Sequence, residues 1–365
     1  MEKILLVAQE GLNKGGVQTV IMSIVKNLHH KYKFDIILFT NEVRYYDNEF
    51  ESFGGKIFRI SFFKSRNVFM RRIEKFLRKT LGYFMIKRII KKNGPYKAVH
   101  CHNSIESPTA LAAAKACNIR SRVNQIHVVF NDSGASAYLR KQHAISKYKM
   151  KSLATACIGC SDLACKSFFS SDYKVILNPY DDGKFQANGI GMKFDSPQLI
   201  QVGNFSNLKN QLFSINVFHE IQKIYPNSHL TFVGHDDGGR YLQRMEELIS
   251  KLNIKDKVSI LPADSDIPRL MQCASYLLMP SRTESFGIVL VEAQAMGLMC
   301  YASDVIPKEP NAGGCMFRSI NEEPKIWAQH IIANFRRTKG FHQSYNMDSY
   351  KGKEIANQIE KLYTL

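Results

Sequence analysis

The sequence predicts an α/β protein built from two doubly wound domains. Short apolar runs alternate with longer segments of helical periodicity, which is typical of parallel sheets flanked by helices. The alternation stops at 178–197, a stretch rich in Gly, Pro, Asp and Asn, and then begins again. A length of 365 residues also favours two domains of ordinary size.

The first half begins with an expected strand. Its opening apolar run is shorter than the core of about 7 to 15 residues that a signal peptide needs, and no stretch approaches the roughly 18 apolar residues of a membrane span. The sequence therefore predicts a cytoplasmic protein. The expected strands are 3–8, 34–40, 96–102 and 155–160, and the expected helices include 17–30 and 107–119.

The second half repeats the pattern and ends in a helical segment. Residues 348–363 have helical spacing, with Asp348 as the expected N-cap. The expected strands are 198–205, 229–234, 257–262 and 275–280, with helices near 209–225, 239–252 and 286–297. The predicted organisation is an N-terminal domain 1–178, a linker 179–197, a C-terminal domain 198–340, and a final segment 341–365 that packs back towards the N-terminal domain.

Ligands of open α/β sheets bind at the carboxyl ends of strands, so the loops there are the first candidates for a site. Gly203 ends an expected strand, and Asn204 and Lys209 follow it before a helix. A helix N-terminus and a lysine together suit a phosphate. An ordinary turn with a solvated lysine explains this segment equally well when it is taken alone.

Two glutamates accompany a later strand. Glu284 and Glu292 are eight residues apart, which is about 12 Å if the whole interval is helical. That separation is too large for one shared proton transfer, and it suits hydrogen bonds to two hydroxyl-bearing parts of a long ligand. Glu292 lies among apolar residues, where an unpartnered carboxylate is costly, so a mere surface role is less favoured.

Glycines also precede the first expected helix. Gly11, Gly15 and Gly16 allow close backbone approach and leave the helix start open to an anion. Their spacing is G-x-x-x-G-G rather than G-x-G-x-x-G, and no acidic residue ends a second strand about 20 residues later. A nicotinamide cofactor is therefore disfavoured.

These segments, in this order, resemble the retaining glycosyltransferases of family four over nearly the whole chain. The resemblance rests on the early glycine loop, 176–185, the loop 202–210 and the Glu-x7-Glu segment. The first half is more loosely similar to bacterial capsule and exopolysaccharide transferases, through 98–104 and 122–127. The resemblance implies the GT-B fold, in which two Rossmann-like domains face an interdomain cleft, and a nucleotide-diphosphate sugar donor with no metal or other cofactor.

The resemblance also implies roles for individual residues. Glu284 would hold hydroxyls of the transferred sugar, Glu292 the ribose, and Lys209 the diphosphate, while His127 would face the reacting carbon. The family loop commonly has Arg where this chain has Asn204, so one cation is missing, and Arg282 is a replacement only by nearness in sequence. The other implied donor-binding positions are Gly203 and the backbone amides of Gly15, Gly16, Ser285, Phe286 and Gly287.

The chain's net charge of +18 lies entirely in its first half. Residues 62–97 contain twelve cations and one acid, and apolar residues recur there at helical intervals, from Phe69, Ile73, Phe76 and Leu77 to Phe84, Met85, Ile89 and Ile90. This pattern predicts a basic amphipathic surface that binds an anionic membrane. A helix packed on its own domain is the alternative, and nucleic acid is disfavoured because no reader motif accompanies the charge.

Neither the cysteines nor the histidines predict a metal site. Cys157 and Cys160 form a C-x-x-C, but no second pair follows at zinc-finger spacing. His100 and His102 lie on one face of an expected strand without a third ligand at suggestive spacing, which favours a cleft-lining or structural role. A buried structural role is also the alternative for His127.

We therefore expect a hexosyltransferase-type enzyme that moves a sugar from a nucleotide-diphosphate donor to a glycan acceptor, lipid-linked, in bacterial surface polysaccharide synthesis, with retention of configuration. It would work in the cytoplasm or at the inner face of the membrane. The alternatives are a nucleotide-sugar 2-epimerase on the same fold, or a basic membrane- or nucleic-acid-binding protein without catalysis.

Overall fold

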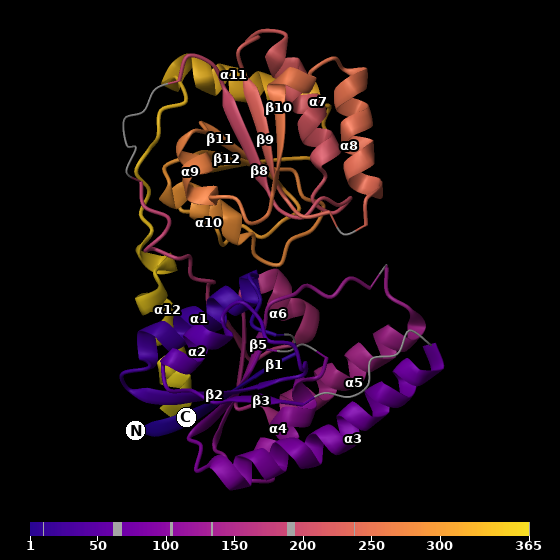
Figure 1. Ribbon diagram of the computed structural model, residues 1–365, viewed down its shortest axis with the longest axis vertical. Coiled ribbons are helices and arrows are strands. Elements are labelled where there is room, and N and C mark those ends of the chain that lie inside the picture. Colours follow the sequence, from indigo (N-terminus) through magenta and orange to yellow (C-terminus); the bar gives the residue numbers. More distant parts are fainter. Residues whose placement is uncertain are drawn as a thin grey trace. The chain divides into compact units, whose positions relative to one another are not determined.

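The computed structural model describes residues 1–9, 11–60, 68–102, 105–132, 134–187, 194–236 and 238–364, with the backbone alone for 68–79. The chain forms two compact units (Figure 1). Unit 1 consists of Met1–Pro179 together with Tyr350–Leu365, and unit 2 of Tyr180–Ser349. Residues 103–104 of the family-like segment 98–104 and residues 188–193 of the expected linker lie outside the described residues.

Unit 1 contains a seven-stranded parallel sheet in the order β3-β2-β1-β4-β5-β6-β7. The order reverses direction between β1 and β4, which makes that point the switch point of a doubly wound sheet. Its strands are β1 (Glu2–Ala8), β2 (Tyr32–Leu38), β3 (Ile57–Arg59), β4 (Ala98–Cys101), β5 (Ser121–Ile126), β6 (Ala156–Gly159) and β7 (Tyr173–Val175).

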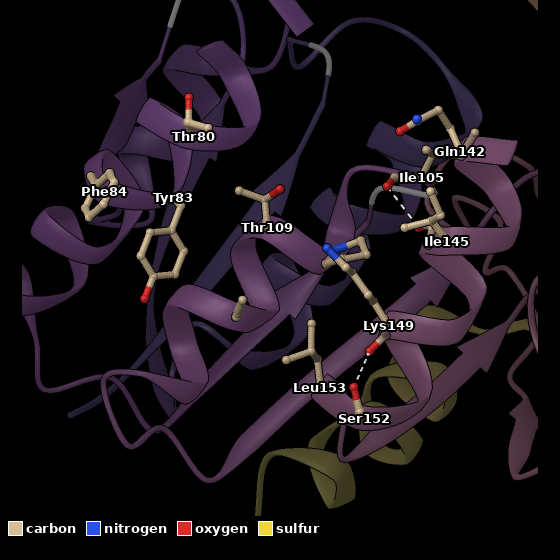
Figure 2. Close-up of a pocket in the computed structure, with 13 residues that line it drawn as sticks. Thr80, Tyr83, Phe84, Ile105, Thr109, Gln142, Ile145, Lys149, Ser152 and Leu153 are labelled. Carbon is tan, nitrogen blue, oxygen red and sulfur yellow. Dashed lines mark hydrogen bonds between the residues drawn. The ribbon is translucent and has the colours of Figure 1, made fainter. Parts of the chain in front are cut away.

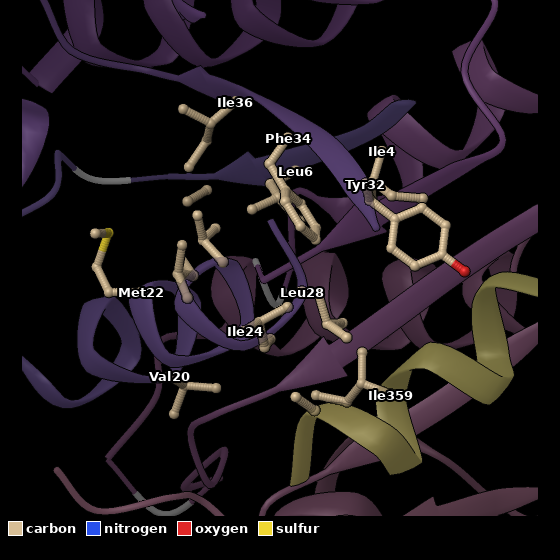
Figure 3. Packing of buried hydrophobic residues seen from close by; sticks show 14 of the residues in the cluster. Ile4, Leu6, Val20, Met22, Ile24, Leu28, Tyr32, Phe34, Ile36 and Ile359 are labelled. Carbon is tan, nitrogen blue, oxygen red and sulfur yellow. The ribbon is translucent and has the colours of Figure 1, made fainter. Parts of the chain in front are cut away.

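Helices cover both faces of this sheet because alternate side chains of β1 point to opposite sides. Ile4 and Leu6 pack in the core of Figure 3, whereas Leu5 and Val7 belong to a second core that includes residues of α3 and α4. The helices of unit 1 are α1 (Gly16–Leu28), α2 (Asp47–Ser52), α3 (Val68–Asn93), α4 (Ser107–Lys115), α5 (Ala137–Leu153), α6 (Asp162–Phe168) and α12 (Gly352–Glu360).

Helix α12 completes the first of these cores although it follows all of unit 2 in the sequence. Ile355, Ile359 and Tyr363 are buried in one cluster with residues of α1 and β2, and Figure 3 shows Ile359 among them. A side chain at Gly352 would come within 2.7 Å of Ser23 on α1, so the two helices approach closely. The expected N-cap at Asp348 is wrong, because 348–350 form a separate 3₁₀ turn and α12 starts only at Gly352.

Unit 2 contains a six-stranded parallel sheet in the order β10-β9-β8-β11-β12-β13, with its switch point between β8 and β11. Its strands are β8 (Gln198–Val202), β9 (His229–Gly234), β10 (Val258–Pro262), β11 (Tyr276–Met279), β12 (Met299–Ser303) and β13 (Cys315–Arg318). Its helices are α7 (Gln211–Gln222), α8 (Arg240–Lys251), α9 (Ile267–Gln272), α10 (Ile288–Ala295) and α11 (Pro324–Thr338).

The basic segment 62–97 is described in part. Residues 61–67 and the side chains up to position 79 lie outside the described residues, so the expectation for Phe69, Ile73, Phe76 and Leu77 is not addressed by the structure. Further along α3, Ile90 is buried in the core of unit 1, while Phe84 and Met85 are exposed. The apolar residues of α3 therefore serve both the core and the surface. No helix within the described residues is long and apolar enough to cross a membrane.

Candidate active site

The sequence-predicted residues of unit 2 follow the two strands that meet at its switch point. Gly203 to Lys209 come directly after β8, and Glu284 to Gly287 lie in the loop between β11 and α10. Because β8 and β11 are neighbouring parallel strands, both loops emerge at one sheet edge. This is where open α/β sheets bind their ligands.

Lys209 and Glu284 form an ion pair across these two loops. The ammonium nitrogen of Lys209 lies 2.6 Å from Glu284 Oε1, and the Ser281 hydroxyl donates to the same oxygen at 2.7 Å. The Glu284 side chain is only 10% exposed, against 30% for Lys209. The carboxylate is therefore held from two sides, while the lysine remains within reach of a ligand.

Further hydrogen bonds hold the two loops against each other. The Gln201 amide donates to the Lys209 carbonyl at 2.8 Å, and the Asn210 amide donates to the Pro280 carbonyl at 3.1 Å. The Arg282 backbone N–H donates to the Leu208 carbonyl at 2.8 Å. Asn210 adopts a left-handed conformation, which Asn tolerates better than most residues. These contacts orient Lys209 before any ligand arrives.

The turn after β8 depends on two glycines. Gly203 has φ +145°, and a side chain at Gly234 of β9 would lie 2.2 Å from the Gly203 carbonyl oxygen. Close approach of these backbones therefore excludes any Cβ at position 234. Asn204, at the position where the family commonly has Arg, is exposed, and its carbonyl accepts from Gln211 at 3.0 Å.

Ser285, Phe286 and Gly287 lead into α10. Phe286 is buried and anchors the turn, while Gly287 has φ +91° at the N-cap. The predicted backbone donors therefore precede the first turn of a helix, where N–H groups have no intrahelical partner. They follow Glu284 directly in the same loop.

Glu292 lies further along α10, half-buried. The pKa of its carboxyl is raised to about 7, chiefly by burial and then by the negative charge of Asp181, while Lys184 acts in the opposite direction. Since α10 begins at Ile288, the interval from Glu284 to Glu292 is only partly helical. The separation of about 12 Å assumed a helix over the whole interval, so it does not apply here.

Unit 1 places its predicted residues at the edge of its own sheet. The glycine loop follows β1, and Gly15 is the N-cap of α1. The Gln18 amide donates to the Gly11 carbonyl at 3.1 Å, while a side chain at Gly16 would meet no atom within 4 Å. The start of α1 therefore has free space at Gly16, whereas a side chain at Gly15 would lie 2.7 Å from Gln18 Oε1.

Three histidines cluster beside this loop. His102 follows β4 and His127 follows β5; Nδ1 of His102 lies 3.0 Å from Nε2 of His127. The His100 and His102 rings are 4.2 Å apart, as expected for one strand face. Burial lowers the pKa of His100 to about 3, of His127 to about 4, and of His102 well below its usual value. All three imidazoles are therefore neutral at pH 7.

The cysteines and acids of the described residues form no group of three or more that could hold a metal ion. All eight cysteines are free thiols. Of the predicted C-x-x-C, Cys157 lies within β6 and Cys160 directly after it, with Cys165 in α6. These thiols contribute to packing in unit 1, where Cys160 and Cys165 are fully buried.

Part of unit 2 matches the model of a known protein family. The model of the glycosyl transferases group 1 family matches residues 184–311, which include Lys209, Glu284 and Glu292. The chain carries a group 1 glycosyltransferase domain. Its two parallel sheets with interleaved helices have the GT-B fold.

The chain is similar to proteins named as glycosyltransferases, one of them for capsular polysaccharide biosynthesis. The chain is 27% identical to the glycosyltransferase EpsF of Bacillus subtilis, over 90% of this chain and 87% of EpsF. It is 25% identical to the capsular polysaccharide biosynthesis glycosyltransferase CapH of Staphylococcus aureus, over 92% and 91%. The crystal structure of Anabaena HepE with UDP and glucose has the same fold, with a TM-score of 0.78, 17% identity and full coverage of both chains.

Two residues of the unit 2 loops escaped the sequence analysis: Ser281 holds Glu284, and Gln201 holds the Lys209 loop. In unit 1, His102 was expected to line a cleft or to be structural, but its hydrogen bond to His127 was not predicted. Ser281 lies two residues past β11, a position where polar side chains reach a ligand edge, so its place was a usable signal. The Gln201 bond depends on how the loop folds back on β8, which periodicity does not show.

Proposed function

We propose that this protein is a retaining hexosyltransferase that moves a sugar from a nucleotide-diphosphate donor to a glycan acceptor, lipid-linked, in bacterial surface polysaccharide synthesis. The observation that carries the proposal is the Lys209–Glu284 pair at the switch point of unit 2. A cation and a carboxylate at one edge of the sheet suit the two parts of such a donor: the cation would bind its diphosphate, and the carboxylate its sugar hydroxyls.

The pair suggests how donor binding begins. The diphosphate replaces Glu284 as the partner of Lys209, and the freed carboxylate accepts hydrogen bonds from sugar hydroxyls. Lys209 and the amides of Ser285 to Gly287 stabilise the charge that develops on the leaving group, the kind of electrostatic preorganisation that dominates many enzymes. With these groups supplying the positive charge, we propose that transfer needs no metal ion, so a chelator leaves turnover unchanged.

The proposed reaction is balanced within the substrates. The bond between the anomeric carbon and the diphosphate oxygen breaks, and the acceptor hydroxyl oxygen bonds to that carbon on the same face. The acceptor proton passes to an oxygen of the departing diphosphate. Glu284 and Glu292 hold the sugar and ribose hydroxyls during these steps, and the neutral His127 donates or accepts one hydrogen bond near the reacting carbon.

The first donor and acceptor to test follow from known proteins. HepE has been crystallised with UDP and with UDP-glucose, which supports uridine diphosphate sugars as donors. An Escherichia coli relative, 21% identical over 64% of this chain, is named as a galactosyltransferase acting on GlcNAc-diphosphoundecaprenol. This supports a lipid-linked glycan acceptor and work at the inner face of the membrane, to which the cations of 62–97 would be attracted.

The test measures donor binding and nucleotide release. A uridine diphosphate sugar at a hundred times its dissociation constant is expected to stabilise the protein by about 2.7 kcal/mol. Release of UDP should require added acceptor glycan. Lys209→Ala should lower that release by roughly 100-fold.

The matched control is Lys223→Ala, which removes a lysine from another ion pair of unit 2, with Glu220, on the outer side of α7. Normal turnover in Lys209→Ala would overturn the proposal. Conversion of the donor without acceptor would favour the epimerase, and the absence of both donor binding and release would favour a non-catalytic binding protein.

A further inference from the structure

A groove in unit 1 is not used by the chemistry proposed above. It lies between α3, α4 and α5 and has a volume of about 600 Å³. Figure 2 shows Tyr83 and Phe84 of α3 on one side, Ile145 and Lys149 of α5 on the other, and Thr109 of α4 between them. Apolar side chains and the aliphatic part of Lys149 make up much of its lining.

The helices on either side of the groove expose large apolar side chains. On α3, Phe84 is 65% exposed and Leu81 is 47% exposed, and on α5 Tyr148 is 81% exposed. An exposed apolar patch bordered by polar residues marks a site of interaction with a protein, a ligand or a membrane. The groove therefore needs an occupant with an apolar part.

The charge of the same helices restricts the occupant further. Helix α5 has five cations and no acid, namely Arg140, Lys141, Lys147, Lys149 and Lys151. Residues 80–93 of α3 add four cations, again without an acid. An apolar groove between two helices with a large excess of cations suits a molecule with an apolar chain and an anionic head.

The size of the groove favours a thin chain over a helix. An α-helix about 10 Å wide would fill 600 Å³ within roughly 8 Å of its length, or about five residues. A contact of about five residues would bury little of a partner helix and would bind it weakly. A single hydrocarbon chain is much thinner and can bury a longer stretch in the same space.

From this combination we infer that the groove between α3, α4 and α5 binds one acyl chain of an anionic phospholipid, with the lysines of α5 contacting the headgroups of the bilayer. This goes beyond the charge attraction proposed for 62–97, because it names a built pocket, a second helix and a lipid chain. It stands on the groove and does not depend on the catalytic assignment.

The chain's one tryptophan makes a direct test possible. Trp327 is fully buried in unit 2, so it serves as an internal reference. Phe84→Trp places an indole at the groove, and Val305→Trp places one at an exposed apolar position of unit 2 as the matched control. With vesicles of phosphatidylglycerol brominated in the acyl chains, we expect at least twofold quenching for Phe84→Trp and little for Val305→Trp.

Charge reversal tests the role of α5. Lys149→Glu combined with Lys151→Glu should weaken binding to phosphatidylglycerol vesicles by roughly tenfold or more. The matched control combines Lys251→Glu with Lys255→Glu, which changes the net charge by the same amount. Lys251 lies in the last turn of α8, as Lys151 lies in the last turn of α5. That control should change binding less than twofold. Unchanged emission of Trp327 shows that each variant is folded.

Three results would overturn the inference: no binding to the anionic vesicles, binding without quenching in Phe84→Trp, or equal loss in the two charge-reversed pairs. The first would leave a protein partner as the occupant, and the second would mean attraction by charge alone. Release of UDP in lipid-free solution is expected to be normal in all four variants, so a failure of the proposed transferase activity is measured separately.

Discussion

Lys209 and Glu284 are 75 positions apart in the sequence, yet their ammonium and carboxylate groups lie 2.6 Å apart at the carboxyl ends of neighbouring strands. If Lys209 binds the diphosphate and Glu284 the sugar, as proposed, binding of the diphosphate must break this contact before the carboxylate is available to a sugar. The proposed donor would then exchange an internal ion pair for two contacts of its own.

This exchange predicts opposite effects on binding and turnover in Glu284→Gln. Free UDP should bind at least as tightly as to the native protein, because no carboxylate competes for Lys209. Transfer should fall by about 100-fold, since the sugar loses its charged acceptor. Titration calorimetry with UDP and a turnover assay measure the two effects. Glu322→Gln, which removes a carboxylate paired with Arg318 elsewhere in unit 2, should change neither.

Glu292→Gln should stabilise the protein at alkaline pH. The folded carboxyl has a pKa of about 7, raised from 4.5 by burial first, so the folded state binds more protons than the unfolded state between these values. Stability therefore falls as pH rises from about 4.5 to 7, by at most about 3 kcal/mol. The melting temperature of Glu292→Gln should exceed that of the native protein at pH 8 and match it near pH 4. An equal difference at both pH values would contradict this expectation.

The buried histidines should produce the opposite slope. His127 has a pKa of about 4 in the folded state against 6.5 in the unfolded state, because burial disfavours its charged form. The unfolded state therefore binds more protons between these values, and stability falls as pH drops from 6.5 towards 4. At pH 5 this single group costs about 2 kcal/mol. Chemical unfolding at pH 7 and pH 5 should show a smaller difference in His127→Gln than in the native protein.

Gly234→Ala should displace the turn after β8 and weaken donor binding. The added methyl group would lie 2.2 Å from the Gly203 carbonyl oxygen, so the turn after β8 must shift, and with it Lys209. We expect donor affinity to fall at least tenfold while the circular dichroism spectrum stays native. The matched control is Gly82→Ala, because a side chain at Gly82 would meet no atom within 4 Å, and this variant should bind donor normally. Gly54 is unsuitable as a control because its φ is positive. Native donor affinity in Gly234→Ala would show that the loop tolerates the shift.

The predicted elements follow local patterns, and the structure confirms them where those patterns are strong. The apolar runs at 3–8, 229–234 and 275–280 became β1, β9 and β11, because buried parallel strands are continuous apolar segments. Asp348 failed as an N-cap because close packing of Gly352 on α1 decides where α12 begins. Tertiary contact overrode a local preference there.

The sequence was enough to predict which residues lie at the candidate site, but not which of them contact each other. That Lys209 and Glu284 would share one sheet edge follows from strand alternation, whereas their direct contact requires knowing that β8 and β11 are neighbours. The His102–His127 bond likewise depends on the pairing of β4 with β5. The groove between α3, α4 and α5 left no motif, because its lining comes from three helices at ordinary helical spacing.

The docking of the final segment on unit 1 has a consequence for biosynthesis. Tyr363 donates to or accepts from the buried His100 ring at 2.9 Å, and Ile355 and Ile359 fill the core beside α1. These residues leave the ribosome only after the whole of unit 2. The core on one face of the first sheet therefore stays incomplete until translation has passed the second sheet, and His100 acquires its partner Tyr363 last.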